Sequence, residues 1–143
     1  MIRVTVAGIA DEAGRAIAAA VAEADDLQLA AGVSPAAAGE TIQNVPVFAS
    51  VADALDAVRV DVVADCTSVA FARSNVITAL ERGVGVVVCT GGLSESDLAA
   101  LDARARETGS GLIAADSFSL LGALMQRFAQ EADRLAARES DVG

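Results

Sequence analysis

The chain has 143 residues, of which 54% are apolar, a formal net charge of −10 and an isoelectric point near 4.2. This is enough apolar material for the core of one ordinary domain, while no apolar run reaches the ~20 residues that a membrane-spanning helix needs. Because the acidic surface repels phosphate backbones and anionic lipids, we expect neither nucleic acid nor a membrane as a partner. The first residues carry no signal-peptide pattern, which predicts a cytoplasmic protein.

The types of charged residue limit the catalytic and metal-binding chemistry that this chain can perform. All 10 basic residues are Arg, and there is no His. A salt-adapted cytoplasm and a GC-rich genome each explain part of this composition, and the excess of 20 acidic over 10 basic residues favours the halophilic interpretation. Without His the commonest general base is absent, and two Cys are too few for a four-ligand zinc site. We therefore predict no catalytic residue and no metal site in this chain.

Apolar periodicity predicts strands that alternate with helices. In chain order, the predicted elements are strand 2–7, helix 12–23, strand 27–33, loop 34–44, strand 45–48, helix 51–58, strand 60–66, helix 71–82, strand 85–89, helix 95–107, strand 111–114 and helix 120–139. Continuous apolar strands joined by helices are typical of a parallel sheet covered on both faces. The pattern predicts an α/β fold in a single domain, residues 1–143, with the doubly wound parallel sheet of the Rossmann type.

Four residues indicate where helices begin and end, and a fifth indicates where one strand lies in the sheet. Ser50 and Ser94 precede helices and are followed three residues later by Asp, close to the spacing of a capping box. Gly83 and Gly109 follow helices, where glycine commonly ends the helical conformation. Pro46 cannot donate a hydrogen bond to a neighbouring strand, which predicts that its strand lies at the edge of the sheet.

The turn after the first strand is the most informative segment. It runs from Gly8 to Gly14, with one residue more between the two glycines than the usual dinucleotide-binding pattern. Such a turn needs its first Gly for a tight bend and its last Gly for close helix packing. Asp11 and Glu12 suit the positive end of a helix but would repel a pyrophosphate. The segment therefore indicates either a dinucleotide site or a strand–turn–helix unit whose phosphate site is weakened or lost.

Further segments carry motifs at the predicted carboxyl ends of strands, where doubly wound sheets bind their ligands. They read Asp65-Cys66-Thr67-Ser68-Val69, Cys89-Thr90-Gly91-Gly92-Leu93 and Ser117-Phe118-Ser119. Together with the Gly8–Gly14 turn, they resemble motifs of the dihydrodipicolinate reductase family, namely Gly-x-x-Gly-Arg-Met-Gly, Asp-Phe-Thr-Ser-Pro, Gly-Thr-Thr-Gly-Leu and Ala-Pro-Asn-Phe-Ser. The resemblance is to the N-terminal domain of that family, and it covers nearly the whole chain in the same order.

The resemblance implies a domain that binds NADPH or NADH. In the family this cofactor passes a hydride to a cyclic imine or enamine in lysine biosynthesis. The residues that match cofactor-binding positions are Gly8, Gly14, Thr67, Ser68, Thr90, Gly92, Phe118 and Ser119. Thr67 and Ser68 are also well placed to cap the helix that follows them, and Thr90 and Gly92 could form only a tight turn.

Departures from the family pattern concern both the binding of the cofactor and the binding and protonation of the substrate. Asp11 and Glu12 replace a Gly and an Arg that help to hold the cofactor phosphates, and the residue that reads the ribose is replaced around Ser34. Cys89, Gly91 and Ser117 replace a Gly, a Thr and an Asn of the later motifs. The family's second domain carries a His-His-x-x-Lys stretch that binds and protonates the substrate, and this chain has neither His nor Lys. We therefore expect the chain to contribute only orientation of the cofactor.

Three functions fit these observations. The chain could be an oxidoreductase subunit that binds NAD(P)H and relies on a separate catalytic partner. It could instead be a non-catalytic nucleotide-binding or regulatory module, or an interaction module that has lost the ligand. Helix 120–139 carries an apolar stripe that ends at Phe128, and we expect the stripe to fold back on the sheet or to pair with another copy in a homo-oligomer.

Two pairs of residues have a structural interpretation beside the functional one. Cys66 and Cys89 end adjacent predicted strands and form either a redox pair, a soft-metal site or, as is commonest, two thiols that pack as small apolar side chains. Asp65 and Asp116 would be acid–base groups only with a proton path, and we expect them to cap or to be solvated.

Overall fold

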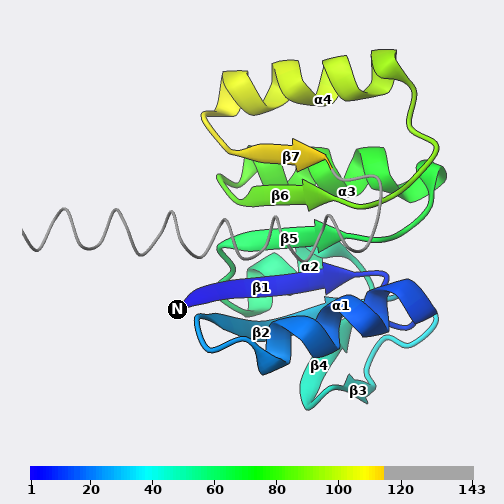
Figure 1. The fold of residues 1–143 in the computed structure, drawn as a ribbon, viewed down its shortest axis with the longest axis vertical. Coiled ribbons are helices and arrows are strands. Elements are labelled where there is room, and N and C mark those ends of the chain that lie inside the picture. The colour runs from blue at the N-terminus through cyan, green and yellow to red at the C-terminus, as the bar shows by residue number, and fades with distance from the viewer. Residues whose placement is uncertain (115–143) are drawn as a thin grey trace, which may run out of the picture.

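A single sheet organises the part of the chain that the structure describes, residues 1–114 of the computed structural model (Figure 1). In chain order the elements are β1 (Ile2–Ala7), α1 (Glu12–Glu23), β2 (Leu27–Val33), β3 (Thr41–Ile42), β4 (Val45–Phe48), α2 (Val51–Ala57), β5 (Val62–Asp65), α3 (Val69–Glu81), β6 (Gly85–Val88), α4 (Glu95–Thr108) and β7 (Leu112–Ala114). The predicted helix 120–139, Asp116 and the expected site residues Phe118 and Ser119 lie outside the described residues.

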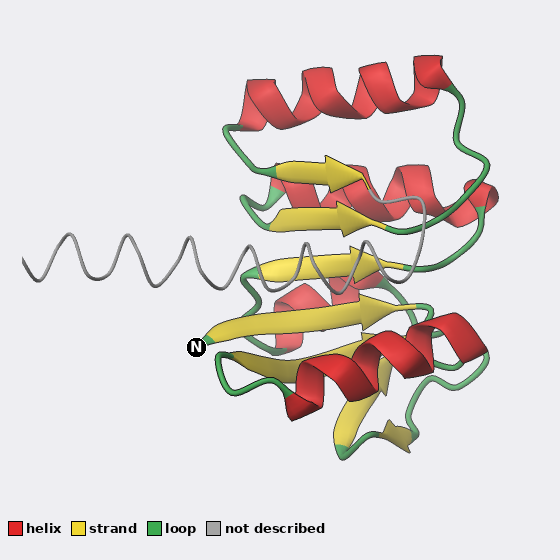
Figure 2. Cartoon of the chain, viewed as in Figure 1, coloured by secondary structure: helices red, strands yellow, loops and turns green. Residues whose placement is uncertain are grey.

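The strand order is β3-β4-β2-β1-β5-β6-β7, and every neighbouring pair is parallel except β3 with β4. From β1 the chain builds outward through β2 and β4, then crosses back to build the other half through β5, β6 and β7. This is the doubly wound arrangement of a Rossmann-type sheet, so the predicted fold is confirmed. Figure 2 shows the arrowheads of the parallel strands at one edge, where the loops that lead into the helices begin.

The strands bury side chains on both faces of the sheet because successive residues point to opposite sides. On one face the buried residues pack with α1 and include Val4, Val6, Leu29, Val62, Ala64, Ile17 and Val21. On the other face they pack with α2, α3 and α4 and include Ala7, Val33, Val63, Val86, Val88, Val76, Leu80 and Leu101. Burial on both faces explains why these strands are continuously apolar.

The predicted loop 34–44 contains a strand that the sequence analysis missed. Gln43 and Asn44 have φ angles of 53° and 64°, so they form a two-residue hairpin turn with both central residues left-handed. The turn folds β3 back on β4, where Thr41 pairs with Pro46. The prediction that the strand of Pro46 lies at the sheet edge is therefore wrong, because β3 covers its outer side.

The helix boundaries follow the capping residues closely. Ser50 accepts a hydrogen bond from the N–H of Asp53 at 3.1 Å, and Ser94 forms a reciprocal capping box with Asp97. The hydrogen bond from the backbone N–H of Ser94 holds the pKa of Asp97 below its usual value. Gly109 takes a left-handed φ of 74° at the end of α4, as its position predicts. In contrast, β5 is shorter than predicted, and α3 begins two residues earlier, at Val69.

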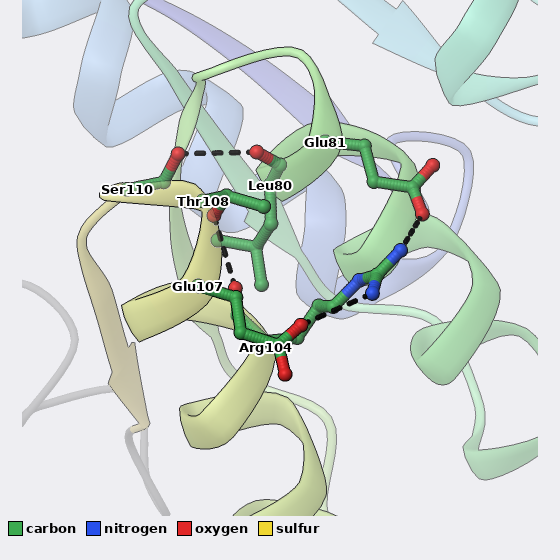
Figure 3. A network of polar contacts seen from close by, with 6 residues as sticks. All are labelled: Leu80, Glu81, Arg104, Glu107, Thr108 and Ser110. Carbon is green, nitrogen blue, oxygen red and sulfur yellow. Dashed lines mark hydrogen bonds and ion pairs between the residues drawn. The ribbon is translucent and has the colours of Figure 1, made fainter.

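A polar network fixes α4 against α3 on the outside of the sheet (Figure 3). Arg104 forms ion pairs with Glu81 of α3 and with Glu107 of its own helix. Beyond the end of α4, the hydroxyl of Ser110 donates to the carbonyl of Leu80 at 3.1 Å. The side chains of these ion pairs are largely exposed to solvent, which screens their charges, so the pairs contribute little to stability. Within residues 1–114, no helix is long and apolar enough to cross a membrane.

Candidate functional site

The turn after β1 has a backbone conformation that favours glycine at its first position. Gly8 has a φ of 90°, and its N–H donates to the carbonyl of Val33 at 2.9 Å. A Cβ on Gly8 would lie 2.5 Å from the carbonyl oxygen of Cys66, closer than real Cβ atoms approach. The turn thus contacts the ends of both strands that flank β1.

Gly14 closes the turn from the side of the helix. It is buried in the first turn of α1, and a Cβ there would lie 1.9 Å from the carbonyl oxygen of Gly8. Gly32 of β2 has a related role that sequence reasoning missed, because a Cβ on it would lie 2.5 Å from the side chain of Ile9. A glycine inside an apolar strand was the available sign of such a close approach. The two glycines let α1 and β2 pack directly against the turn, which is the close packing that a dinucleotide-binding turn requires.

Two exposed carboxylates stand at the start of α1. Asp11 occupies the N-cap position, but its side chain makes no capping hydrogen bond, and Glu12 is the first helical residue. Both side chains are exposed to solvent. Their charges interact favourably with the positive end of the helix, by ~0.3–1 kcal/mol each, and oppose any anion bound at the same place.

A buried carboxylate lies at the end of β5. Asp65 has no exposed surface, and it accepts three side-chain hydrogen bonds. One oxygen accepts from the hydroxyl of Thr67 at 2.9 Å and from the amide of Asn75 at 3.1 Å, and the other accepts from the hydroxyl of Thr90 at 2.8 Å. The expectation that Asp65 would cap a helix or be solvated is therefore wrong. Sequence reasoning also missed Asn75, which lies in α3, the next helix along the chain.

The electrostatics of Asp65 reflect its burial. Loss of hydration raises the pKa of this carboxyl, and the hydrogen bonds from Asn75, Thr90 and Thr67 offset part of that rise. The donors come from α3 and from the loops that follow β5 and β6. Asp65 therefore holds together the two loops in which Thr67 and Thr90 lie.

The loops after β5 and β6 also approach each other at their tips. Ser68 is the N-cap residue of α3, and its side chain makes no capping hydrogen bond. Gly92 has a φ of 89°, and a Cβ on it would lie 3.1 Å from a methyl carbon of Val69. The side chain of Ser68 therefore does not cap α3, although its position made that role possible. Thr67 likewise directs its hydroxyl to Asp65.

The two cysteines are neighbours, as their positions at the ends of adjacent strands predict. Their Sγ atoms are 3.4 Å apart. Cys66 is buried and Cys89 is partly exposed. The hydrogen bond that Cys66 donates to Cys89 and the burial of its side chain both raise the pKa of the Cys66 thiol. Among residues 1–114 there is no group of three or more side chains suited to bind a metal ion.

The described residues of the predicted site therefore gather at one edge of the sheet. Gly8 and Gly14 form the turn after β1, and the peptide of Cys66 and Thr67 packs directly on Gly8. Thr90 joins them through Asp65. The chain order reverses between β1 and β5, and ligands of doubly wound sheets bind at such a switch point.

Comparison with known proteins agrees with this geometry. The family model described as "Dihydrodipicolinate reductase, N-terminus" matches residues 2–118. The chain belongs to this family. The resemblance that the sequence motifs indicate is thereby confirmed, and the match includes the predicted residue Phe118, although the structure does not describe it.

Curated relatives are 4-hydroxy-tetrahydrodipicolinate reductases. The chain is 34% identical to that of Halalkalibacterium halodurans over 140 residues, which cover 92% of this chain and 53% of the relative. It is 35% identical to that of Streptococcus thermophilus over 133 residues, which cover 93% of this chain and 52% of the relative. The chain spans about half the length of the curated relatives it matches.

Solved structures share the fold. Dipicolinate-bound dihydrodipicolinate reductase from Paenisporosarcina sp. TG-14 superposes with a TM-score of 0.74 at 23% identity, covering 92% of this chain and 53% of that one. Biliverdin reductase from Synechocystis, in complex with biliverdin and NADP⁺, superposes with a TM-score of 0.64 at 21% identity, covering 79% of this chain and 37% of that one. At these identities the likeness concerns the Rossmann-type fold alone.

Proposed function

We propose that this chain is the NAD(P)H-binding domain of a reductase of the dihydrodipicolinate reductase type, and that residues outside it bind and protonate the substrate. The observation that carries the proposal is the contact between Gly14 and Gly8. A Cβ at Gly14 would lie 1.9 Å from a backbone oxygen, so the chain retains the close packing that a pyrophosphate-binding turn requires. The curated relatives are about twice as long, which leaves room for a substrate domain beyond the matched part.

The cofactor would lie across the carboxyl edge of the sheet. Backbone N–H groups at the start of α1 would face the pyrophosphate, because a helix N-terminus leaves such donors unpaired. Within the turn, the N–H groups of Gly8 and Asp11 already donate to the carbonyls of Val33 and Gly8. The nicotinamide supplies the hydride, and the chain's residues bind and orient it. The proposed binding residues are Gly8, Gly14, Thr67, Ser68, Thr90, Gly92, Phe118 and Ser119.

Asp65 would act as a positioning residue in this site. Its carboxylate oxygens accept hydrogen bonds from the hydroxyls of Thr67 and Thr90 at 2.9 and 2.8 Å, which fixes the positions of both hydroxyls. Each hydroxyl donates its proton to Asp65 and retains lone pairs that can accept a hydrogen bond from the carboxamide of the nicotinamide. The site thus offers acceptors on two neighbouring loops whose relative position is fixed by one buried carboxylate.

The charges around the turn make NADH the better ligand. Asp11 and Glu12 are exposed beside the pyrophosphate position, and a 2′-phosphate would add more negative charge to a chain of net charge −10. The residues that follow β2 are Ser34, Pro35 and Ala36, none of which is a cation. A 2′-phosphate is usually bound by an Arg near this position. We therefore propose weaker binding of NADPH than of NADH.

Isothermal titration calorimetry of the full chain with each reduced cofactor tests the proposal. We expect NADH to bind and its affinity to increase between low and molar salt, because salt screens the repulsion from Asp11 and Glu12. An ordinary phosphate site loses affinity as salt is added. Absence of heat with both cofactors at every salt concentration would contradict the proposal.

An interaction module that has lost the ligand is the second candidate. The observation in its favour is the pair of carboxylates at the start of α1, where the family has a Gly and an Arg. If this candidate is correct, neither cofactor raises the thermal unfolding midpoint of the chain, whereas a bound ligand raises it by mass action. The thermal shift therefore discriminates between the two functions independently of calorimetric heats.

A further inference from the structure

Cys66 and Cys89 form a pair that the proposed cofactor site does not use. Asp65 and Val88 are paired in the register of β5 and β6, so the next residues along each strand are also opposite each other. The Sγ atoms of the two cysteines lie 3.4 Å apart. Both side chains pack in the core that contains Ile9, beneath the turn after β1.

We propose that Cys66 and Cys89 are a thiol-modification site, which low-molecular-weight disulfides oxidise reversibly to a disulfide that joins β5 to β6. Neighbouring strands lie ~4.8 Å apart, which falls within the ~4.4–6.8 Å between Cα atoms that disulfides span. A disulfide bond is ~2.0 Å long, so the sulfurs need to approach by about 1.4 Å from their present separation of 3.4 Å. Rotation of the two side chains would bring the sulfurs together.

The oxidation consists of two thiol–disulfide exchanges. The thiolate of Cys89 attacks one sulfur of the small disulfide, forms a mixed disulfide and releases one small thiolate, which takes up the proton that Cys89 lost. The thiolate of Cys66 then attacks Sγ of Cys89 and releases the second small thiolate, which takes up the proton of Cys66. Two protein thiols are oxidised, and one small disulfide is reduced to two thiols.

The structure assigns the first attack to Cys89. Its side chain is partly exposed, whereas Cys66 is only 7% exposed. The S–H of Cys66 donates to Sγ of Cys89, so the two sulfurs already face each other. Cys66 keeps its proton until the mixed disulfide has formed, because this hydrogen bond and burial both oppose its ionisation.

The test treats the reduced full chain with oxidised glutathione and follows it by intact mass spectrometry and peptide mapping. We expect the chain to lose the mass of two hydrogen atoms, to yield a peptide that links Cys66 to Cys89, and to recover both thiols with dithiothreitol. A stable glutathione adduct on the unvaried chain, or two unreacted thiols, would overturn the proposal. The readout needs no bound dinucleotide, so it is independent of the proposed function.

Two variants test the order of attack. Cys66→Ser is expected to stop at a mixed disulfide on Cys89, and Cys89→Ser is expected to react at least about tenfold more slowly, because its remaining thiol is buried. Equal rates would contradict the assigned order. If either variant fails to fold, alkylation of the unvaried reduced chain gives the same information, since peptide mapping should show Cys89 labelled before Cys66.

Discussion

Replacement of Gly14 by Ala offers a direct test of the packing on which the cofactor site depends. In an ordinary helix interior, Gly→Ala stabilises by ~0.8–1.0 kcal/mol, because Ala loses less conformational freedom. At position 14 the new Cβ would lie 1.9 Å from the carbonyl oxygen of Gly8 and 2.9 Å from Cα of Ile9. Both contacts are with backbone atoms, which cannot rotate away, so α1 has to shift.

The magnitude follows from these two opposing effects. Contacts shorter than 3.0 Å are essentially never seen for a real Cβ, so the helix needs to move by about 1.1 Å from the carbonyl oxygen of Gly8. Overpacking of this kind costs ~1–3 kcal/mol, and a gap of ~1 Å also forfeits up to half of the dispersion energy of the contacts that it opens. Ile17, Ala18 and Val21 of α1 are the buried side chains affected. After subtraction of the propensity gain, we expect a net loss of about 2 kcal/mol.

Urea unfolding followed by circular dichroism measures this change, and calorimetry with NADH measures its effect on binding. Gly111→Ala is the matched control, because a Cβ there meets nothing within 4 Å and its φ is not left-handed. Gly111 precedes β7, at the amino end of that strand and away from the proposed cofactor site. The control is expected to alter stability by less than ~0.5 kcal/mol and to bind NADH normally. If Gly14→Ala unfolds at the same urea concentration as the control, the inferred contact between α1 and the turn is wrong.

Three further predictions concern polar groups. Burial raises the folded-state pKa of Asp65, so the parent loses stability as the pH rises above ~4 and this group ionises. Asp65→Asn should therefore gain stability relative to the parent over that rise, and a pH-independent difference between the two in urea unfolding would contradict this. Thr5→Val should stabilise the fold by about 1 kcal/mol in the same assay, because the hydroxyl of Thr5 is buried without a hydrogen-bond partner among the described residues. A destabilised variant would show that the hydroxyl has a partner. Neutralisation of the turn in the double variant Asp11→Asn, Glu12→Gln should tighten NADH binding about threefold to tenfold at low salt and have little effect at molar salt, whereas equal gains at both would exclude electrostatic repulsion as the cause.

The sequence was sufficient to predict the first three elements of the fold. The bounds of β1, α1 and β2 agree with the predicted ranges because each β-branched or amphipathic run ends at a clear change of composition. The short strand β3 could not be predicted, because its two residues are held only by pairing with β4 and by a turn in which Gln43 adopts a φ that its side chain does not favour. Local patterns do not report such a tertiary pairing.

The candidate site was predictable in its position but not in its internal contacts. Strand order alone places Cys66 beside Cys89, and the structure confirms that prediction. The burial of Asp65 was not predictable from its neighbours in sequence, because two of the three groups that satisfy it, Asn75 and Thr90, are 10 and 25 residues away. A charged residue at the end of an apolar strand is more commonly solvated, and only the three-dimensional contacts reverse that expectation.

The carboxylates of this site divide into two kinds that salt can distinguish. Asp11 and Glu12 are exposed, so their repulsion of a pyrophosphate is screened within a Debye length, which falls from ~10 Å at 0.1 M to ~3 Å at 1 M ionic strength. Asp65 is fully buried and acts through hydrogen bonds at 2.8–3.1 Å, which such screening scarcely reaches. At molar salt the exposed pair would therefore oppose cofactor binding only weakly, while the internal network would keep Thr67 and Thr90 in place. The same two carboxylates that weaken the turn at low salt are then compatible with a working dinucleotide site at high salt.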